Sequence, residues 1–155
     1  MIQDSGTGNT FPAEVSLATA EDARSLGPGW NFDWLSVIIL GGEVYILRAP
    51  GRSDEILGLM AITRQRGFIE IDLLESGPSH VGRRKRVKGI AGTLIAHAAK
   101  TSFTAGCAGY LRLISKTQLI PHYERTYGFI RQGKSQILHL NTRASNAIIT
   151  LFEGG

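Results

Sequence analysis

The sequence predicts a single α/β domain with a mixed central sheet, and three observations lead to this prediction. The chain has 155 residues, which is enough for one domain with its own hydrophobic core. Strand-like alternation over 43–48, 56–63 and 68–76, with short turns between these segments, is typical of an antiparallel meander. A helical pattern after Gly89 then separates the third strand from a further strand at 110–115. A helix that crosses between two strands of one sheet predicts that they are parallel neighbours.

The N-terminal residues predict a loose lead-in followed by a strand and a helix. Residues 1–12 are rich in Gly, Ser and Thr and have little to bury, so we expect them to be flexible and the folded domain to cover 13–155. A short strand is expected at 14–17. Thr19 is a good N-cap for a helix that ends near Leu26, because acidic residues occupy its first turn.

The segment before the meander is ambiguous. Residues 30–40 fit either a short helix that enters a strand or one buried segment, and we interpret 31–36 as a helical turn. Within the meander, Pro50 to Asp54 is expected to form a hairpin loop.

The C-terminal part predicts a helix, a strand and a final element of open type. The helix is expected over 116–127, and Gly128 is well placed to end it. A long strand follows over 129–140, which Gly133 could interrupt. The pattern of 144–152 fits a helix or a strand.

Composition argues against several classes of protein. Hydrophobic residues make up 43% and charged residues 19%, as in ordinary soluble globular proteins. No apolar run approaches the ~20 residues that span a bilayer, and the start lacks a signal-peptide pattern, so we expect a cytoplasmic protein with no membrane partner. The single cysteine, Cys107, excludes an intramolecular disulfide and a cysteine-based metal cluster. The four histidines are scattered, so we expect no metal site.

The positive charge of the chain is concentrated in one turn. Five of the 17 Lys and Arg residues lie between Arg83 and Lys88, and the other 12 face 13 acidic residues. Gly89 and Gly92 follow and open a helix. Free N–H groups and the dipole at a helix N-terminus attract anions, and glycine lets the backbone come close to them. A compact phosphate ligand suits this turn better than duplex nucleic acid does, because proteins usually bind a duplex with Lys and Arg residues spread along a surface.

Two common phosphate-binding loops do not match this turn. A P-loop needs Lys followed by Ser or Thr after its last glycine, whereas Thr93 follows Gly92 directly. A dinucleotide fingerprint places three glycines directly after a strand, whereas Gly89 and Gly92 follow a basic loop.

The turn does match the signature R/Q-x-x-G-x-G/A, in the residues Arg86-Val87-Lys88-Gly89-Ile90-Ala91. It is followed by a helix, a strand and a helix that carries Tyr123 and ends in Gly128-Phe129. In this combination the chain resembles the GNAT superfamily of N-acetyltransferases over roughly residues 14–140. It is also similar to a bacterial subset of that superfamily whose substrate is unassigned.

The resemblance implies a GNAT-like domain that uses acetyl-CoA as the acyl donor and needs no metal. In this family the pyrophosphate binds at the helix N-terminus, and the strand before the basic loop diverges from its parallel neighbour so that pantetheine fits between them. The implied cofactor-binding residues are Leu74, Ser76, Arg83, Arg84, Arg86, Val87, Lys88, Gly89, Ile90, Ala91, Gly92, Thr93 and Lys116.

The resemblance also implies a general acid on the second helix. Tyr123 is the candidate, because a phenol with a pKa near ~10 is protonated at neutral pH and can donate to a departing thiolate. Four residues separate Tyr123 from Gly128, where the usual spacing has three. Tyr127 therefore stays open as an alternative acid.

The general base is less defined by the sequence. Glu75 is best placed, since the resemblance puts it beside the thioester. His122 and His80 are alternatives, and a water relay could replace a single base.

The expected activity is direct transfer of an acetyl group to a primary amine of a small molecule or peptide. Trp30 and Trp34 suggest an apolar or aromatic wall for the substrate, and a homodimer is a possible assembly. One alternative is a catalytically weak GNAT-fold sensor or structural subunit that binds acyl-CoA. A less favoured alternative is a nucleic-acid-binding module that uses the basic turn.

Overall fold

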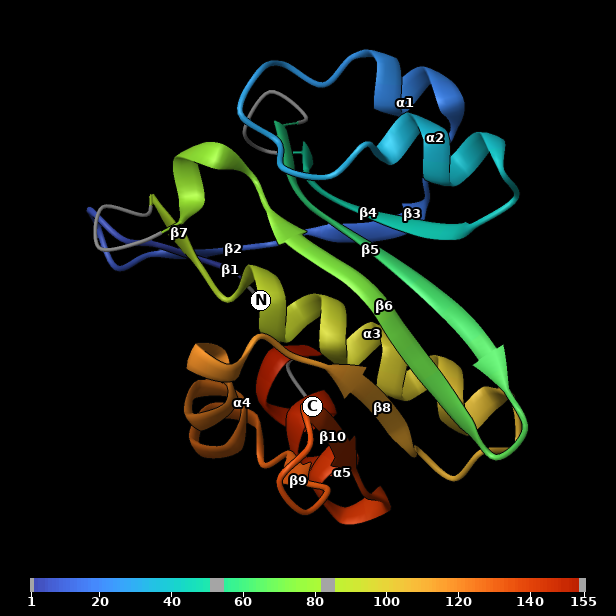
Figure 1. The fold of residues 1–155 in the computed structure, drawn as a ribbon. Coiled ribbons are helices and arrows are strands. Elements are labelled where there is room, and N and C mark those ends of the chain that lie inside the picture. The colour runs from blue at the N-terminus through green and yellow to red at the C-terminus, as the bar shows by residue number, and fades with distance from the viewer. Residues whose placement is uncertain (1, 51–54, 82–85, 154–155) are drawn as a thin grey trace. The chain divides into compact units, whose positions relative to one another are not determined.

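The computed structural model describes residues 2–50, 55–81 and 86–153 (Figure 1). Arg83 and Arg84, which the sequence predicts to bind the cofactor, lie outside the described residues, as does most of the predicted hairpin loop at 50–54. In the part that is described, no helix is long and apolar enough to cross a membrane.

Seven of the ten described strands form one mixed sheet, flanked by helices, which confirms the predicted fold class. In sheet order they are β3 (Glu14–Leu17), β4 (Glu43–Ala49), β5 (Glu55–Gln65), β6 (Phe68–Ser76), β8 (Leu111–Ile114), β10 (Ile137–Leu140) and β9 (Ile130–Arg131).

The central pair of this sheet is parallel, as predicted. β6 and β8 run in the same direction, with Ile69 opposite Leu111 and Ile71 opposite Leu113. The pairs β3–β4 and β8–β10 of the same sheet are antiparallel. A helix, α3 (Ile90–Thr104), makes the crossover between β6 and β8.

The chain forms two compact units, one from the described residues of 1–61 and 73–94 and the other from 62–72 and 95–155. In the first unit, α1 (Ala20–Arg24) and α2 (Trp34–Ile39) lie side by side next to β4 (Figure 1). The core here consists of Trp34, Val44, Ile46, Leu59 and Ala61.

Both helices of the first unit begin at a side-chain cap. Thr19 and Asp22 form a reciprocal capping box, which confirms Thr19 as the N-cap of α1. The Asp33 carboxylate accepts the Ser36 backbone N–H at 3.1 Å, so α2 starts three residues later than the predicted helical turn.

The N-terminal segment differs from the predicted loose lead-in. β1 (Ile2–Asp4) and β2 (Thr10–Phe11) form a hairpin, and β1 also pairs with β7 (Val87–Lys88). Ile2 is fully buried, and the Asp4 carboxylate closes the turn by accepting the N–H groups of Gly6 and Thr7. Strand pairing, one buried apolar side chain and one Asx turn thus order a segment whose composition is otherwise that of a linker.

The second unit differs from the sequence predictions in two places and defines one element that the sequence leaves open. The predicted helix over 116–127 is a 3₁₀ turn, η3 (Thr117–Leu119), followed by α4 (Ile120–Tyr127). The predicted long strand is the hairpin β9–β10, and Gly133, with a φ of 56°, lies in its turn. Residues 144–152, which the sequence leaves as either a helix or a strand, belong to a helix, α5 (Thr142–Glu153).

Gly128 ends α4 in the left-handed conformation, with a φ of 82°, as its position in the sequence predicts. Its N–H donates to the Glu124 carbonyl at 3.1 Å.

Candidate functional site

The N-terminus of α3 has the features of an anion site in the first unit. Gly89 has a φ of 93° and joins β7 to α3, a conformation that favours glycine. The first N–H groups of α3 have no partner within the helix, as in any α-helix. Arg86 and Lys88 are exposed just before it, so two cations and free backbone donors occupy the same short segment.

The other predicted cofactor residues of this segment have local roles. Val87 and Ile90 are buried in the core, and the Thr93 hydroxyl donates to the Gly89 carbonyl at 2.7 Å. An anion here would therefore contact the backbone and the side chains of Arg86 and Lys88, while Val87, Ile90 and Thr93 hold the turn in shape.

Gly58 on β5 lets α3 approach the sheet closely. A Cβ atom at this position would lie 2.7 Å from Cγ2 of Ile90 and 3.0 Å from the carbonyl oxygen of Glu75. These distances are too short for any side chain, so the start of α3 depends on a glycine at position 58.

Glu75, the predicted base, is buried at 8% exposure and accepts three hydrogen bonds. Asn31 N donates to Oε2 at 2.6 Å, and the Trp34 indole donates to Oε1 at 2.8 Å. Phe32 N also donates to Oε1, at 3.3 Å. The carboxylate therefore ties the end of β6 to the segment that enters α2.

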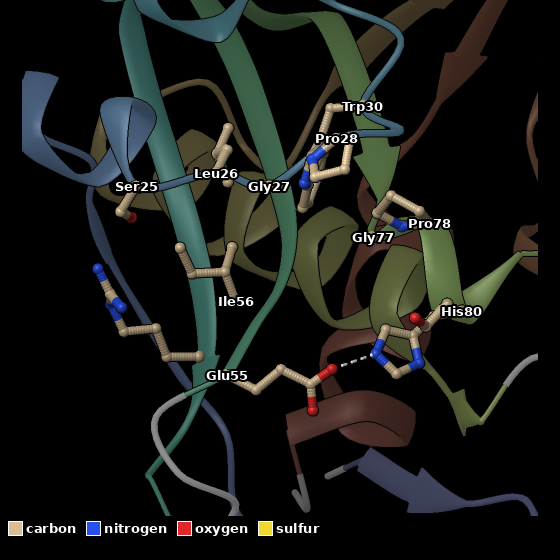
Figure 2. Close-up of a pocket in the computed structure, with 12 residues that line it drawn as sticks. Ser25, Leu26, Gly27, Pro28, Trp30, Glu55, Ile56, Gly77, Pro78 and His80 are labelled. Atoms are coloured by element: carbon tan, nitrogen blue, oxygen red, sulfur yellow. Dashed lines mark hydrogen bonds and ion pairs between the residues drawn. The ribbon is translucent and has the colours of Figure 1, made fainter.

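A cavity of about 420 Å³ lies in the first unit (Figure 2). One wall is the segment between α1 and α2, and the other is the 3₁₀ turn η2 (Pro78–His80) that follows β6, with β4 and β5 supplying further side chains. Its described lining residues are Ser25, Leu26, Gly27, Pro28, Trp30, Arg48, Glu55, Ile56, Gly77, Pro78, Ser79 and His80.

Three ionisable residues that line this cavity, Arg48, Glu55 and His80, take part in two pairs. The Arg48 guanidinium is paired with the Asp22 carboxylate. Nε2 of His80 lies 2.8 Å from Oε1 of Glu55, and this pair faces the cavity (Figure 2). Nδ1 of His80 is buried and has no hydrogen-bond partner among the described residues.

The two tryptophans predicted to form the substrate wall are placed differently. Trp30 is partly exposed and lines the cavity. Trp34 is 1% exposed and belongs to the core of the first unit, where its indole N–H is used by Glu75. Trp34 can thus shape the wall only through its neighbours.

In the second unit, α4 carries the candidate acids within an aromatic cluster. Tyr123 packs against His122, Tyr127 and Phe129, with ring centroids 5.7–5.9 Å apart. Burial raises the pKa of Tyr123. Burial, and to a smaller degree the neighbouring Tyr123, raises the pKa of Tyr127 to about 12. Both phenols therefore hold their protons at neutral pH.

The histidines join no group of three or more candidate metal ligands among the described residues. No group of three or more His, Cys, Asp or Glu residues that could hold a metal is present in 2–50, 55–81 and 86–153. His122 is exposed and lies 3.2 Å from the Thr126 hydroxyl, and His139 lies 2.6 Å from the Gln132 amide oxygen.

Sequence comparisons find nothing similar, since no protein-family model and no curated protein matches the chain. Solved structures do match. The KacTA–DNA complex superposes with a TM-score of 0.63 at 17% identity, over 93% of this chain and 100% of that one. The toxin AtaT complexed with acetyl-methionyl-tRNAfMet gives a TM-score of 0.59 at 15% identity, over 90% and 100%. A Bacillus subtilis acetyltransferase in complex with CoA gives 0.54 at 17% identity, over 84% and 99%.

The chain has the GNAT fold. The parallel pair β6–β8, joined through the basic turn and α3, is therefore the GNAT element that the signature residues predict. Leu74 and Ser76 lie on β6 beyond its last recorded parallel pair with β8, at Ile71. Lys116 follows β8 and is exposed.

Several residues that line the cavity are not predicted as site residues from the sequence. Arg48 ends one predicted strand and Glu55 directly precedes another, and nothing in their spacing connects them with His80 or with α1. The contact of Gly29 with Pro78 is equally hidden, although a Gly-Pro-Gly stretch does mark Gly29 as a turn residue.

Proposed function

We propose that this protein is an acetyltransferase that moves the acetyl group of acetyl-CoA directly to a primary amine. The proposal rests mainly on the start of α3. Here free N–H groups, a glycine with positive φ and exposed Arg86 and Lys88 come together in a GNAT fold. One solved structure with this fold is an acetyltransferase in complex with CoA. The fold and the anion site support the same donor.

In this proposal the CoA phosphates are held by the backbone of Gly89–Gly92 and by cations of the basic turn. The backbone N–H groups donate to the phosphate oxygens, and the helix dipole adds favourable potential. Arg86 and Lys88 contribute charge, and the proposal assigns the same role to Arg83 and Arg84.

The chemistry requires an unprotonated amine, stabilisation of the oxyanion and a proton for the leaving group. The amine nitrogen attacks the thioester carbonyl, and the C–S bond breaks as the C–N bond becomes an amide. Tyr123 donates its phenolic proton to the departing thiolate, since its raised pKa keeps it protonated until transfer. The proton lost by the amine leaves to water or to a side-chain base.

The acceptor side of the reaction is proposed to use the cavity beside Trp30 and the Glu55–His80 pair. A partly exposed indole and a carboxylate suit a ligand with an apolar body and an ammonium group. AtaT is solved in complex with acetyl-methionyl-tRNAfMet. An aminoacyl-tRNA therefore joins small amines and peptides as a candidate acceptor.

An acceptor screen tests the proposal. Purified protein with acetyl-CoA is offered polyamines, amino acid methyl esters, peptides and aminoacylated tRNA, with free thiol measured during the reaction and product mass afterwards. We expect amine-dependent release of CoA and a product heavier by one acetyl group. Binding of acetyl-CoA without release by any amine would instead support the acyl-CoA sensor.

A further inference from the structure

We infer that Glu75 is a positioning residue for the acceptor site and not the general base. Its carboxylate holds the segment before α2, and that segment forms a wall of the cavity proposed to take the acceptor. The inference rests on the proposed acetyl transfer for its kinetic consequences, while the anchoring itself is independent of any activity.

The anchoring is complete on both oxygens of the carboxylate. Two successive backbone amides, at Asn31 and Phe32, and the indole N–H of Trp34 all point to it. At 8% exposure, Glu75 has little contact with water, so these donors replace its hydration. Because all three donors bond to one buried carboxylate, Glu75 fixes the positions of the Asn31 and Phe32 backbone and of the Trp34 indole.

The same stretch of chain anchors the wall at a second point. Gly29, with a φ of 99°, lies so close to Pro78 that a Cβ atom would be 2.8 Å from the proline Cγ. Glu75 and Pro78 are three residues apart and fix the two ends of the segment 29–34. Trp30, which lines the cavity, lies between these anchors.

The position of Glu75 fits this role better than proton abstraction. Glu75 is not among the described residues that line the cavity, whereas Glu55 and His80 are. All three partners of Glu75 are donors only, so a proton added to its carboxylate would meet no acceptor among them.

Hydrogen exchange at single amides tests the anchoring. Glu75→Gln keeps the shape of the side chain but sets an NH₂ group against a donor, and Trp34→Phe removes one donor while leaving the carboxylate intact. Both variants should speed exchange at Asn31 and Phe32 by about tenfold or more, while CoA affinity measured by calorimetry stays within about threefold. Glu21→Gln, on an exposed side chain of α1, is the matched control and should change neither.

Unchanged exchange at Asn31 and Phe32 in Glu75→Gln would overturn the inference. If that variant does not fold, Trp34→Phe gives the same decision, since it also removes one of the three bonds. If the unmodified protein does not bind CoA, the proposed donor is refuted but the exchange result still tests the anchoring by Glu75. Failure of the proposed function can therefore be distinguished from failure of this inference.

Steady-state kinetics with an acceptor from the screen separates positioning from base catalysis. As a positioning residue, Glu75 predicts that Glu75→Gln and Trp34→Phe each raise the acceptor KM about tenfold, with kcat within about threefold and the pH profile of kcat/KM unchanged in shape. A general base predicts a large loss of kcat and of the acidic limb of the profile in Glu75→Gln only, and this result would contradict the inference.

Discussion

The rings of Tyr123 and Tyr127 lie 5.9 Å apart, one helical turn from each other on α4. Tyr127 is 9% exposed and also packs against Phe152, whereas Tyr123 is partly open to solvent. The two tyrosines that the sequence leaves as alternative acids therefore have different environments. Access to a ligand favours Tyr123, and core packing accounts for Tyr127.

Replacing Tyr123 by Phe should remove the general acid and keep the aromatic cluster. We expect kcat to fall by about 10²–10³, because general acid catalysis contributes about 10²–10⁴. CoA binding should be unchanged. Tyr127→Phe is the matched control and should retain activity within a few-fold in the same CoA-release assay. The reverse pattern, with Tyr127→Phe inactive and Tyr123→Phe active, would move the acid to Tyr127.

The buried phenol of Tyr127 should make stability fall at alkaline pH. Its folded-state pKa of about 12 lies above the usual value near 10, because burial favours the neutral form. The neutral Tyr127 phenol therefore makes its full contribution to the free energy of unfolding below about pH 10, and this contribution is lost as pH rises from 10 towards 12. The loss amounts to at most about 3 kcal/mol. Urea unfolding at several pH values measures it, and Tyr127→Phe should flatten the decline.

Gly58→Ala should disturb the start of α3. The new methyl would meet Ile90 and the Glu75 carbonyl, and overpacking of this kind costs about 1–3 kcal/mol. We also expect weaker CoA binding, since the first turn of α3 must shift. Gly27→Ala is the control, because a Cβ atom there would have no described atom within 4 Å apart from its own residue and its two chain neighbours. Equal unfolding midpoints for the two variants in urea would speak against the close approach.

The N-terminal hairpin should contribute to stability despite its composition. Ile2→Ala removes a fully buried side chain and should lower the free energy of unfolding by about 2–4 kcal/mol. Ile39→Ala, at a position 63% exposed, should cost less than about 0.5 kcal/mol. A negligible effect of Ile2→Ala in denaturant titrations would restore the flexible lead-in that the sequence predicts.

The sequence predicts the elements whose signals are local. Thr19 with an acidic first turn, Gly128 after an amphipathic helix, and the strand–helix–strand order around α3 each rest on a few neighbouring residues, and the structure confirms them. The signature at Arg86–Ala91 predicts the fold for the same reason.

The remaining features depend on contacts between residues far apart in the chain. The pairs Glu75–Trp34 and His80–Glu55 join residues 41 and 25 positions apart, and no spacing rule connects them. The ordered structure of residues 2–11 depends on pairing with β7, where Asp4 lies opposite Val87, more than 80 positions away in the chain. The sequence also places Trp34 in the substrate wall and not in the core, because the sequence pattern of a buried tryptophan does not differ from that of an exposed one. Only the Glu75 carboxylate that accepts its N–H distinguishes the two.

Binding of acetyl-CoA is the central claim, and isothermal titration calorimetry measures it most directly. Titration of acetyl-CoA or CoA into the purified protein should give a one-to-one complex at micromolar affinity, weakened by Arg86→Ala and Lys88→Ala and by added salt. If titration at micromolar concentrations gives no heat of binding, this result would contradict both the proposed enzyme and the acyl-CoA sensor.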